Sequence, residues 1–198
     1  MTRAFRLGLT GSIGMGKSTT AGFFAEAGIP VWDADTAVHS LYAPGGAAVA
    51  PVAALCPAAL VDGGIDREAL RSWIAQDSTA LAQLEATVHP LVASDRSSFL
   101  EHALGDIVLL DIPLLFETGG DAMMDATLLV TAPPALQRAR VLARPGMTPG
   151  RFETILARQM PDREKRSRAT HIIETLSIAS VRAGVMALLD WIRSSHHA

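Results

Sequence analysis

The sequence predicts an α/β fold of three layers, in which helices cover both faces of a five-stranded parallel sheet. Apolar runs of strand length recur along the chain, segments with helical spacing separate them, and a glycine-rich loop joins the first strand to the first helix. Because strands alternate with helices, we expect a ligand to bind beyond the carboxyl ends of the strands. The predicted strands are 5–10, 29–32, 107–112, 126–131 and 171–174.

Composition narrows the class of protein. The chain has 198 residues, 49% of them hydrophobic, which suits one compact unit or a core with small insertions. A net charge of −3 argues against a general nucleic-acid binder. The single cysteine, Cys56, cannot form an intrachain disulfide, so we expect a reducing, cytoplasmic compartment. No signal peptide is recognised, and the uncharged stretch 43–61 contains three prolines, which predict turns and short helices rather than a membrane span.

The first strand is followed by a phosphate-binding signature. Residues 11–18 read Gly-Ser-Ile-Gly-Met-Gly-Lys-Ser, which fits the P-loop pattern G-x-x-x-x-G-K-[ST], and a helix is expected from about residue 17 to residue 26. Backbone amides of such a loop wrap a polyphosphate, Lys17 reaches the β- and γ-phosphates, and the Ser18 hydroxyl is placed to bind Mg²⁺. The expected phosphate-binding residues are Gly11, Ser12, Ile13, Gly14, Met15, Gly16, Lys17, Ser18 and Thr19.

The second strand ends at two carboxylates, Asp33 and Asp35. If the strand continues, both project from one face toward the site. A phosphoryl-transfer enzyme needs a carboxylate to orient or deprotonate the attacking hydroxyl, and we favour Asp35 for this role, with Asp33 on the metal side. The alternative is that either residue caps the helix expected over 36–41.

The stretch that follows is predicted to be helical to about residue 104. Asp66 is expected to cap one helix, and Asp77 or Ser78 to cap a second that stops before Pro90. A third helix is expected over 91–104. His89 precedes that proline, and a lone histidine there is more often a structural cap or a core contact than a catalyst.

The third strand ends near Asp111, where P-loop proteins often place a carboxylate directed at the metal. An ordinary charge at a strand end is the alternative. Residues 113–117, Pro-Leu-Leu-Phe-Glu, follow it and either line an acceptor site or belong to core and surface.

A basic segment follows the fourth strand. Residues 138–168 hold nine of the 17 Lys and Arg residues against three Asp or Glu, which favours a mobile cover over an anionic ligand. Gln137, Arg140 and Arg144 are spaced to share one face of a helix from about residue 135, and guanidinium groups suit phosphate oxygens. Surface salt bridges are the alternative. We expect a hinge at Pro145-Gly146, a helix over 149–160 and a closing helix over 180–194.

These stretches together resemble the dephospho-coenzyme A kinase family over nearly the whole chain. The resemblance rests on residues 9–19, Asp33-Ala34-Asp35, Pro44-Gly45, Ile65-Asp66-Arg67, His89-Pro90, residues 111–117, and Gln137 with Arg140 and Arg144.

The resemblance implies a function and a domain layout. The family transfers the γ-phosphoryl group of ATP to the ribose 3′-hydroxyl of dephospho-coenzyme A. Its fold implies a nucleotide-binding core at 1–42, 105–138 and 169–198, an acceptor domain at 43–104 and a lid at 139–168. Small-molecule substrates are therefore expected, with no nucleic acid and no membrane, and the sequence indicates no oligomeric state.

The resemblance also implies roles for single residues. Asp35 looks like the catalytic carboxylate, and Lys17, Arg140 and Arg144 like the cations that stabilise the phosphate. The implied acceptor-binding residues are Asp33, Asp35, His89, Leu114, Leu115 and Glu117, and the implied Mg²⁺ ligands are Ser18, Asp33 and Asp111.

Two departures from the family concern adenine recognition. Thr170 stands where the family carries Asp, and Thr175 stands where it carries Asn. Two rival functions remain: another small-molecule P-loop kinase, which a panel of acceptors would reveal, and a nucleotide-driven switch. The chain has no guanine-selective Asn-Lys-x-Asp stretch to favour the switch.

Overall fold

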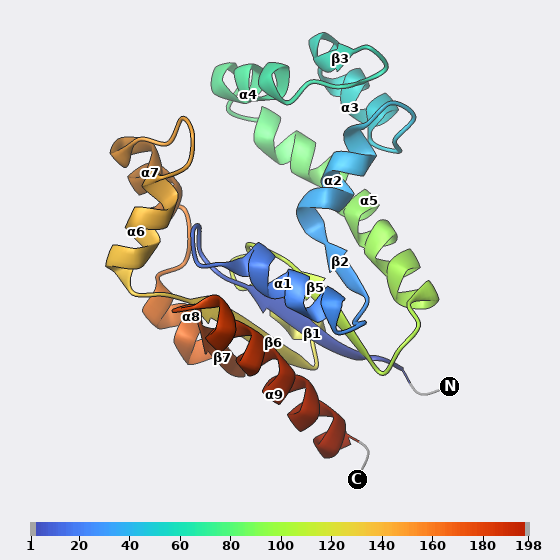
Figure 1. Ribbon diagram of the computed structural model, residues 1–198. Helices are drawn as coiled ribbons and strands as arrows, with labels where there is room; N and C mark the ends of the chain where they lie inside the picture. The colour runs from blue at the N-terminus through green and yellow to red at the C-terminus, as the bar shows by residue number, and fades with distance from the viewer. Residues whose placement is uncertain (1–2, 197–198) are drawn as a thin grey trace. The chain divides into compact units, whose positions relative to one another are not determined.

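A computed structural model describes residues 3–196 (Figure 1), so the outermost residues of the predicted core lie outside the described range. The chain divides into two compact units. Residues up to Trp32 and from Leu104 onward form the first, and Asp33–Ala103 forms the second. The predicted lid, 139–168, belongs to the first unit by its packing. The assignment of an acceptor domain and a lid stays a prediction.

The first unit is built on a five-stranded parallel sheet, as predicted. Its order is β2-β5-β1-β6-β7, with β1 in the centre. Leu9 of β1 is in register with Asp111 of β5 on one side and with Leu128 of β6 on the other. The carboxyl ends of these strands therefore meet at the start of the glycine-rich loop. The strands are β1 Phe5–Thr10, β2 Val31–Asp33, β5 Ile107–Asp111, β6 Ala126–Thr131 and β7 His171–Glu174.

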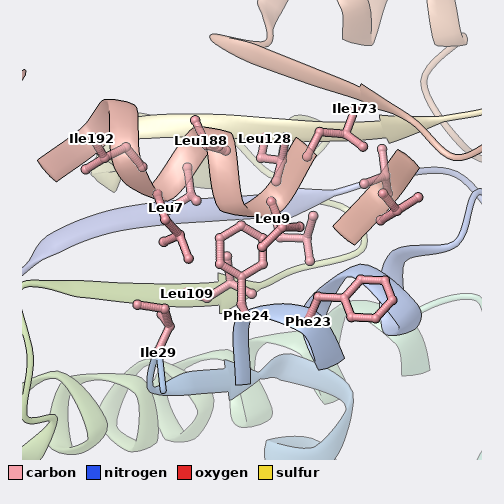
Figure 2. Packing of buried hydrophobic residues seen from close by; sticks show 14 of the residues in the cluster. Leu7, Leu9, Phe23, Phe24, Ile29, Leu109, Leu128, Ile173, Leu188 and Ile192 are labelled. Atoms are coloured by element: carbon pink, nitrogen blue, oxygen red, sulfur yellow. The ribbon is translucent and has the colours of Figure 1, made fainter. Parts of the chain in front are cut away.

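The main core lies between the sheet and two helices, α1 (Lys17–Glu26) and α9 (Ile178–His196), which contact each other. Figure 2 shows Phe24 of α1 beside Leu7, Leu9 and Leu109 of the sheet, with Leu188 and Ile192 of α9 nearby. Alternate residues of each strand face this core because side chains of a strand alternate between its two faces. Burying this face fixes the position of the loop between β1 and α1.

The basic segment forms three helices rather than the expected two. The helices are α6 (Pro134–Leu142), α7 (Pro149–Leu156) and α8 (Asp162–Arg168). The helix predicted over 149–160 was too long, and α8, which contacts β6, was missed. Pro161 explains the division, because proline disfavours helical geometry in the residue before it and lacks an N–H donor.

The second unit is mostly helical and has its own apolar cluster. It contains a short β-hairpin with Asp62 and Gly63 as its turn, which was not predicted from the sequence. Both residues have positive φ, 50° and 79°, which is the geometry of a tight two-residue hairpin turn. The elements are α2 Ala34–Tyr42, α3 Val49–Leu55, the 3₁₀ turn Pro57–Ala59, β3 Leu60–Val61, β4 Gly64–Ile65, α4 Arg67–Gln76 and α5 Ala80–His102.

The break predicted at Pro90 is wrong, because α5 runs through this residue without interruption. Proline inside a helix costs about 3 kcal/mol. Leu84 and Val88 before the proline and Leu91 after it all pack into the same apolar cluster, and this burial outweighs the cost. The predicted cap of α5 shifts as well: Thr79 is its N-cap, and Asp77 accepts hydrogen bonds from the Thr79 amide and hydroxyl in the preceding turn. The predicted cap of α4 by Asp66 is confirmed.

Within residues 3–196, no helix combines the length and the apolar character needed to cross a membrane.

Candidate active site

The shape of the glycine-rich loop depends on two positions that only glycine can occupy without strain. Gly14 and Gly16 have φ values of 77° and 86°, in the left-handed region that other residues avoid. A Cβ on Gly14 would also lie 2.4 Å from a methyl carbon of Val141 on α6. Gly16 is the N-cap of α1, so the loop ends where the helix begins. The first amides of α1 have no acceptor within their own helix and present a positive end to an anion.

Two glutamines hold the backbone of Ile13, in the middle of this loop, on both sides of its Cα. The Gln137 side-chain amide donates to the Ile13 carbonyl at 2.8 Å, and the Ile13 amide donates to Oε1 of Gln159 at 3.0 Å. Gln137 was predicted to face the site, whereas Gln159 was not singled out. Nothing in its local pattern separates Gln159 from a surface residue; only the tertiary fold brings it to the loop.

Lys17 pairs with the carboxylate at the end of β5. Its Nζ lies 2.6 Å from Oδ1 of Asp111, which is buried. The lysine expected to bind phosphate and the carboxylate expected to direct a metal are therefore neighbours.

A cavity of about 360 Å³ opens beside the loop, between α6 and the segment that follows β7. Gly14, Gly16 and Thr19 line one side, and Arg140 and Arg144 line another. Among the described residues, no acidic side chain pairs with either arginine. Two guanidinium groups without a carboxylate counter-ion, next to the glycine-rich loop, have the charge and geometry that suit a polyphosphate. The remaining lining residues are Thr175, Leu176, Ser177, Ile178 and Val181.

Other cations of the basic segment are engaged with acids instead. Arg166 pairs with Asp162 and Glu174, and Arg168 pairs with Asp121. The alternative of salt bridging thus describes part of this segment. It does not describe the two arginines of the cavity.

Glu117 forms an ion pair with Lys165, a further cation of the basic segment. Its Oε1 lies 2.8 Å from Nζ of Lys165, which is completely buried, and it also accepts from the Met160 amide at 2.8 Å. Burial alone would raise the pKa of the Glu117 carboxyl, but Lys165 and the Met160 amide outweigh this effect and hold the pKa below its ordinary value. Glu117 therefore ties the loop after β5 to the end of the predicted lid.

The Asp33 and Asp35 pair is arranged differently from the expectation of a continued strand. β2 ends at Asp33, which caps α2 by accepting from the Thr36 amide at 2.6 Å. Asp35 lies in the first turn of α2 and is exposed. The two residues thus share no strand face, because the chain turns into a helix between them. The capping alternative is confirmed for Asp33.

The other residues assigned to the acceptor lie in varied settings. His89 is exposed within α5, so it is neither a cap nor a core contact. Leu114 is 42% exposed, whereas Leu115 next to it is completely buried. Leu115 thus belongs to the core, and the Leu114 side chain is partly exposed at the surface. Their proposed role in acceptor binding stays a prediction.

The departures at Thr170 and Thr175 are both built into the fold. Thr170 exchanges hydrogen bonds with Thr127 at the start of β6: each backbone amide donates to the other residue's hydroxyl, at 3.0 and 3.1 Å. Thr175 accepts from Arg140 through its hydroxyl at 2.8 Å and through its carbonyl at 2.6 Å. Both threonines therefore make hydrogen bonds that hold parts of the fold together.

The fold and this site together define a P-loop phosphotransferase. Comparison with known proteins gives the family: the family model described as dephospho-CoA kinase matches residues 5–179, and the chain belongs to this family. The family and the kinase class predicted from the sequence are thereby confirmed.

Similar proteins agree with this assignment. A protein named dephospho-CoA kinase from Cereibacter sphaeroides is 71% identical over 99% of this chain and 100% of its own length. Another with that name from Jannaschia sp. is 58% identical over 94% of this chain and 96% of its own. The crystal structure of TT1252 from Thermus thermophilus has a TM-score of 0.85 and 34% identity, covering 95% of this chain and 97% of that one. The structure of dephospho-CoA kinase from Campylobacter jejuni shares the fold, with a TM-score of 0.65 and 21% identity over 94% and 96% of the two chains.

Proposed function

We propose that this chain transfers the γ-phosphoryl group of ATP to the ribose 3′-hydroxyl of dephospho-coenzyme A, with the residues assigned below. One observation carries the assignment: Arg140 and Arg144 line the cavity beside the glycine-rich loop and have no carboxylate partner among the described residues. Cations placed in this way stabilise an anion that the protein itself does not supply.

The glycine-rich loop and three cations, Lys17, Arg140 and Arg144, would bind the triphosphate of ATP. Residues Gly11 to Thr19 would hold the polyphosphate through those of their amides that are not already engaged, because the Ile13 amide donates to Gln159 and the Met15 amide to the Ser12 carbonyl. Lys17 would reach the terminal phosphate groups. Charge on the equatorial oxygens of the transferring group is stabilised by fixed cations, and Arg140 and Arg144 supply them. Both arginines follow β6, so their position is set by the same sheet that sets the loop.

Magnesium is proposed as the metal, because the donors present suit it. Mg²⁺ is usually bound by one or two carboxylates together with substrate phosphates and waters. Asp111 and the exposed Ser18 hydroxyl stand beside Lys17 and the start of α1, and within the described range no three His, Cys, Asp or Glu side chains gather into a metal cage. Ser18 and Asp111 would hold the ion, with Asp33 as the further carboxylate. The ion would neutralise phosphate charge.

The acceptor end rests on resemblance. Asp35 would orient or deprotonate the 3′-hydroxyl. We assign the acceptor domain to 43–104 and the lid to 139–168, with Pro145-Gly146 as hinge; Gly146 lies between α6 and α7 and has a φ of 72°. Asp33, His89, Leu114, Leu115 and Glu117 complete the proposed acceptor site. A cytoplasmic location is proposed with the activity, and the chain's one cysteine, which is buried and free, agrees with a reducing compartment.

Release of ADP from Mg-ATP tests this function. Purified protein is assayed with dephospho-coenzyme A and, separately, with adenosine monophosphate, and coenzyme A formation is followed by chromatography. ADP release that requires dephospho-coenzyme A supports the proposal. Phosphorylation of the monophosphate alone would leave the P-loop chemistry in place and overturn the acceptor assignment.

The two arginines need their own comparison. Arg144→Ala is expected to lower kcat by about 100-fold, which is typical for the loss of one contact made in the transition state. Arg151→Ala is the matched control, because this exposed arginine of the same basic segment lies on α7 and outside the cavity lining. Equal rates for the two variants would remove Arg144 from the mechanism.

A further inference from the structure

Thr175 is a buried polar residue at the meeting point of the loop and the cavity. It follows β7 directly and is 3% exposed. A buried hydroxyl without partners is costly, so its hydrogen bonds show what it holds in place. These partners come from three separate parts of the chain.

The hydroxyl proton of Thr175 has two acceptors within reach, the carbonyls of Met15 at 3.0 Å and Thr131 at 3.2 Å. The Thr131 carbonyl already accepts from the Thr175 amide at 2.8 Å. A hydroxyl carries a single proton, and the shorter contact to the less engaged acceptor is the favoured one. The proton is therefore assigned to Met15, inside the phosphate-binding loop.

The same oxygen accepts a hydrogen bond from Arg140. One guanidinium nitrogen donates to the Thr175 hydroxyl at 2.8 Å, and the second donates to the Thr175 carbonyl at 2.6 Å. This two-point contact fixes the plane of the guanidinium group as well as its position. Because the hydroxyl donates to Met15 and accepts from Arg140, one atom connects the loop to the arginine.

The methyl side of Thr175 also touches the loop. A Cβ on Gly16 would lie 3.2 Å from the Thr175 Cγ2 and 3.3 Å from its Oγ1. The threonine is thus packed against the residue that caps α1. Thr175 therefore contacts the loop twice, through its hydroxyl at Met15 and through its methyl side at Gly16.

We propose that Thr175 is a positioning residue: its hydroxyl holds Arg140 in register with the phosphate-binding loop, so that the arginine meets the transferring phosphoryl group. This inference rests on the proposed function, because it gives Arg140 its target. Thr175 itself touches no reacting atom. It acts through the orientation of Arg140.

A double-mutant cycle tests the proposal. Thr175→Val keeps the size and shape of the side chain and removes the hydroxyl. It is expected to lower kcat about tenfold or more, the loss expected for a hydrogen bond to a charged group. KM for ATP should change by less than kcat, because the ground-state contacts of the loop amides remain. In an Arg140→Ala background, Thr175→Val should change kcat by less than about twofold, since nothing is left for the hydroxyl to position.

Conservative replacement separates positioning from folding. Thr175→Ser keeps the hydroxyl and loses only the methyl group that faces Gly16, so it should retain kcat within about threefold even if its melting temperature falls. Equal losses from Thr175→Val in the two backgrounds, or a tenfold loss in the serine variant, would overturn the proposal. If the valine variant does not fold, Thr175→Ala takes its place in the cycle.

A failure of the proposed function would be recognised separately. If the wild-type protein does not phosphorylate dephospho-coenzyme A, the acceptor assignment falls, and the cycle is then read by calorimetry from the affinity for a non-hydrolysable ATP analogue, which carries the γ-phosphate. Thr175→Val should weaken binding of this analogue several-fold only when Arg140 is present. The same weakening without Arg140 would overturn the inference independently of the acceptor.

Discussion

Lys17 and Asp111 form a close ion pair, with Nζ and Oδ1 2.6 Å apart, at the junction of the central strand β1 and its neighbour β5. The Asp111 side chain is only 2% exposed, and that of Lys17 is 15% exposed. A buried carboxylate keeps its charge most easily beside a cation. The lysine that we propose to bind phosphate is therefore held in position by a carboxylate of the sheet.

Asp111→Asn should raise the Mg²⁺ concentration needed for half-maximal activity by about tenfold. The amide keeps an oxygen for Lys17 but lacks the negative charge that a hard cation prefers. Initial rates measured over a range of MgCl₂ at fixed ATP check this expectation. Asp190→Asn, on the exposed side of α9, is the control. Identical metal dependence in the two variants would exclude Asp111 as a ligand.

Asp35→Asn should keep ATP binding and lose turnover by at least about 100-fold, because it removes the group proposed to act on the attacking hydroxyl. Calorimetry with ATP and a steady-state assay with dephospho-coenzyme A measure the two effects. Asp62→Asn is matched in chemistry and lies in the exposed hairpin turn of the same unit. An unchanged kcat for Asp35→Asn would remove this residue from the mechanism.

Two glycine substitutions in the same region should have opposite effects on stability. Gly14→Ala forces a left-handed residue to carry a side chain and places it 2.4 Å from Val141, so we expect a loss of about 1–3 kcal/mol in the free energy of unfolding. Gly22→Ala lies inside α1 with nothing within 4 Å of the new methyl group, and a gain of about 0.5–1 kcal/mol is expected. Urea denaturation of both variants decides. Loss of stability in both would show that helix α1 is strained elsewhere.

Acid should reveal the ion pair of Glu117 and Lys165. The pKa of Glu117 lies below its ordinary value of 4.5, so the folded state binds this proton less tightly than the unfolded state. The stability that the pair contributes is complete above about pH 4.5 and is lost as the pH falls through the lowered value. The difference in unfolding free energy between wild type and Glu117→Gln should therefore shrink from pH 6 toward pH 3. A difference that stays constant over this range would mean that folding does not shift the pKa of Glu117.

The strands of the sheet were predictable because each is a short apolar run followed by a turn signal. The continuity of α5 was not, since the effect of Pro90 depends on whether residues on both sides reach one core. The hairpin could have been found from Asp62-Gly63, a strong turn signal that the surrounding alanines and prolines obscured. The hydrogen bonds of Gln137 and Gln159 to Ile13 join residues more than 100 positions apart, and no local pattern encodes such a contact.

The candidate site could be proposed from the sequence alone where its residues lie in a contiguous motif, and the roles of these residues stay predictions. The loop and Lys17 are read directly from residues 11–18. Arg140 and Arg144 were identified by their spacing on a helix, but their distinction from the paired Arg166 and Arg168 required the positions of the acids. The outcome at Asp33 and Asp35 depended on where β2 ends, because the chain turns into α2 directly after Asp33.

The central place of β1 has a consequence for synthesis of the protein. Both neighbours of this strand, β5 and β6, come from residues 107–131, roughly 100 residues later in the chain. At about 5–20 residues per second, a ribosome needs roughly 5–20 seconds to make that interval. During this time β1 has neither partner strand, and the contiguous unit Asp33–Ala103 is completed just before β5 is made. A nascent chain halted before Ile107 thus exposes β1, and the nucleotide-binding loop attached to it has no sheet to hold it.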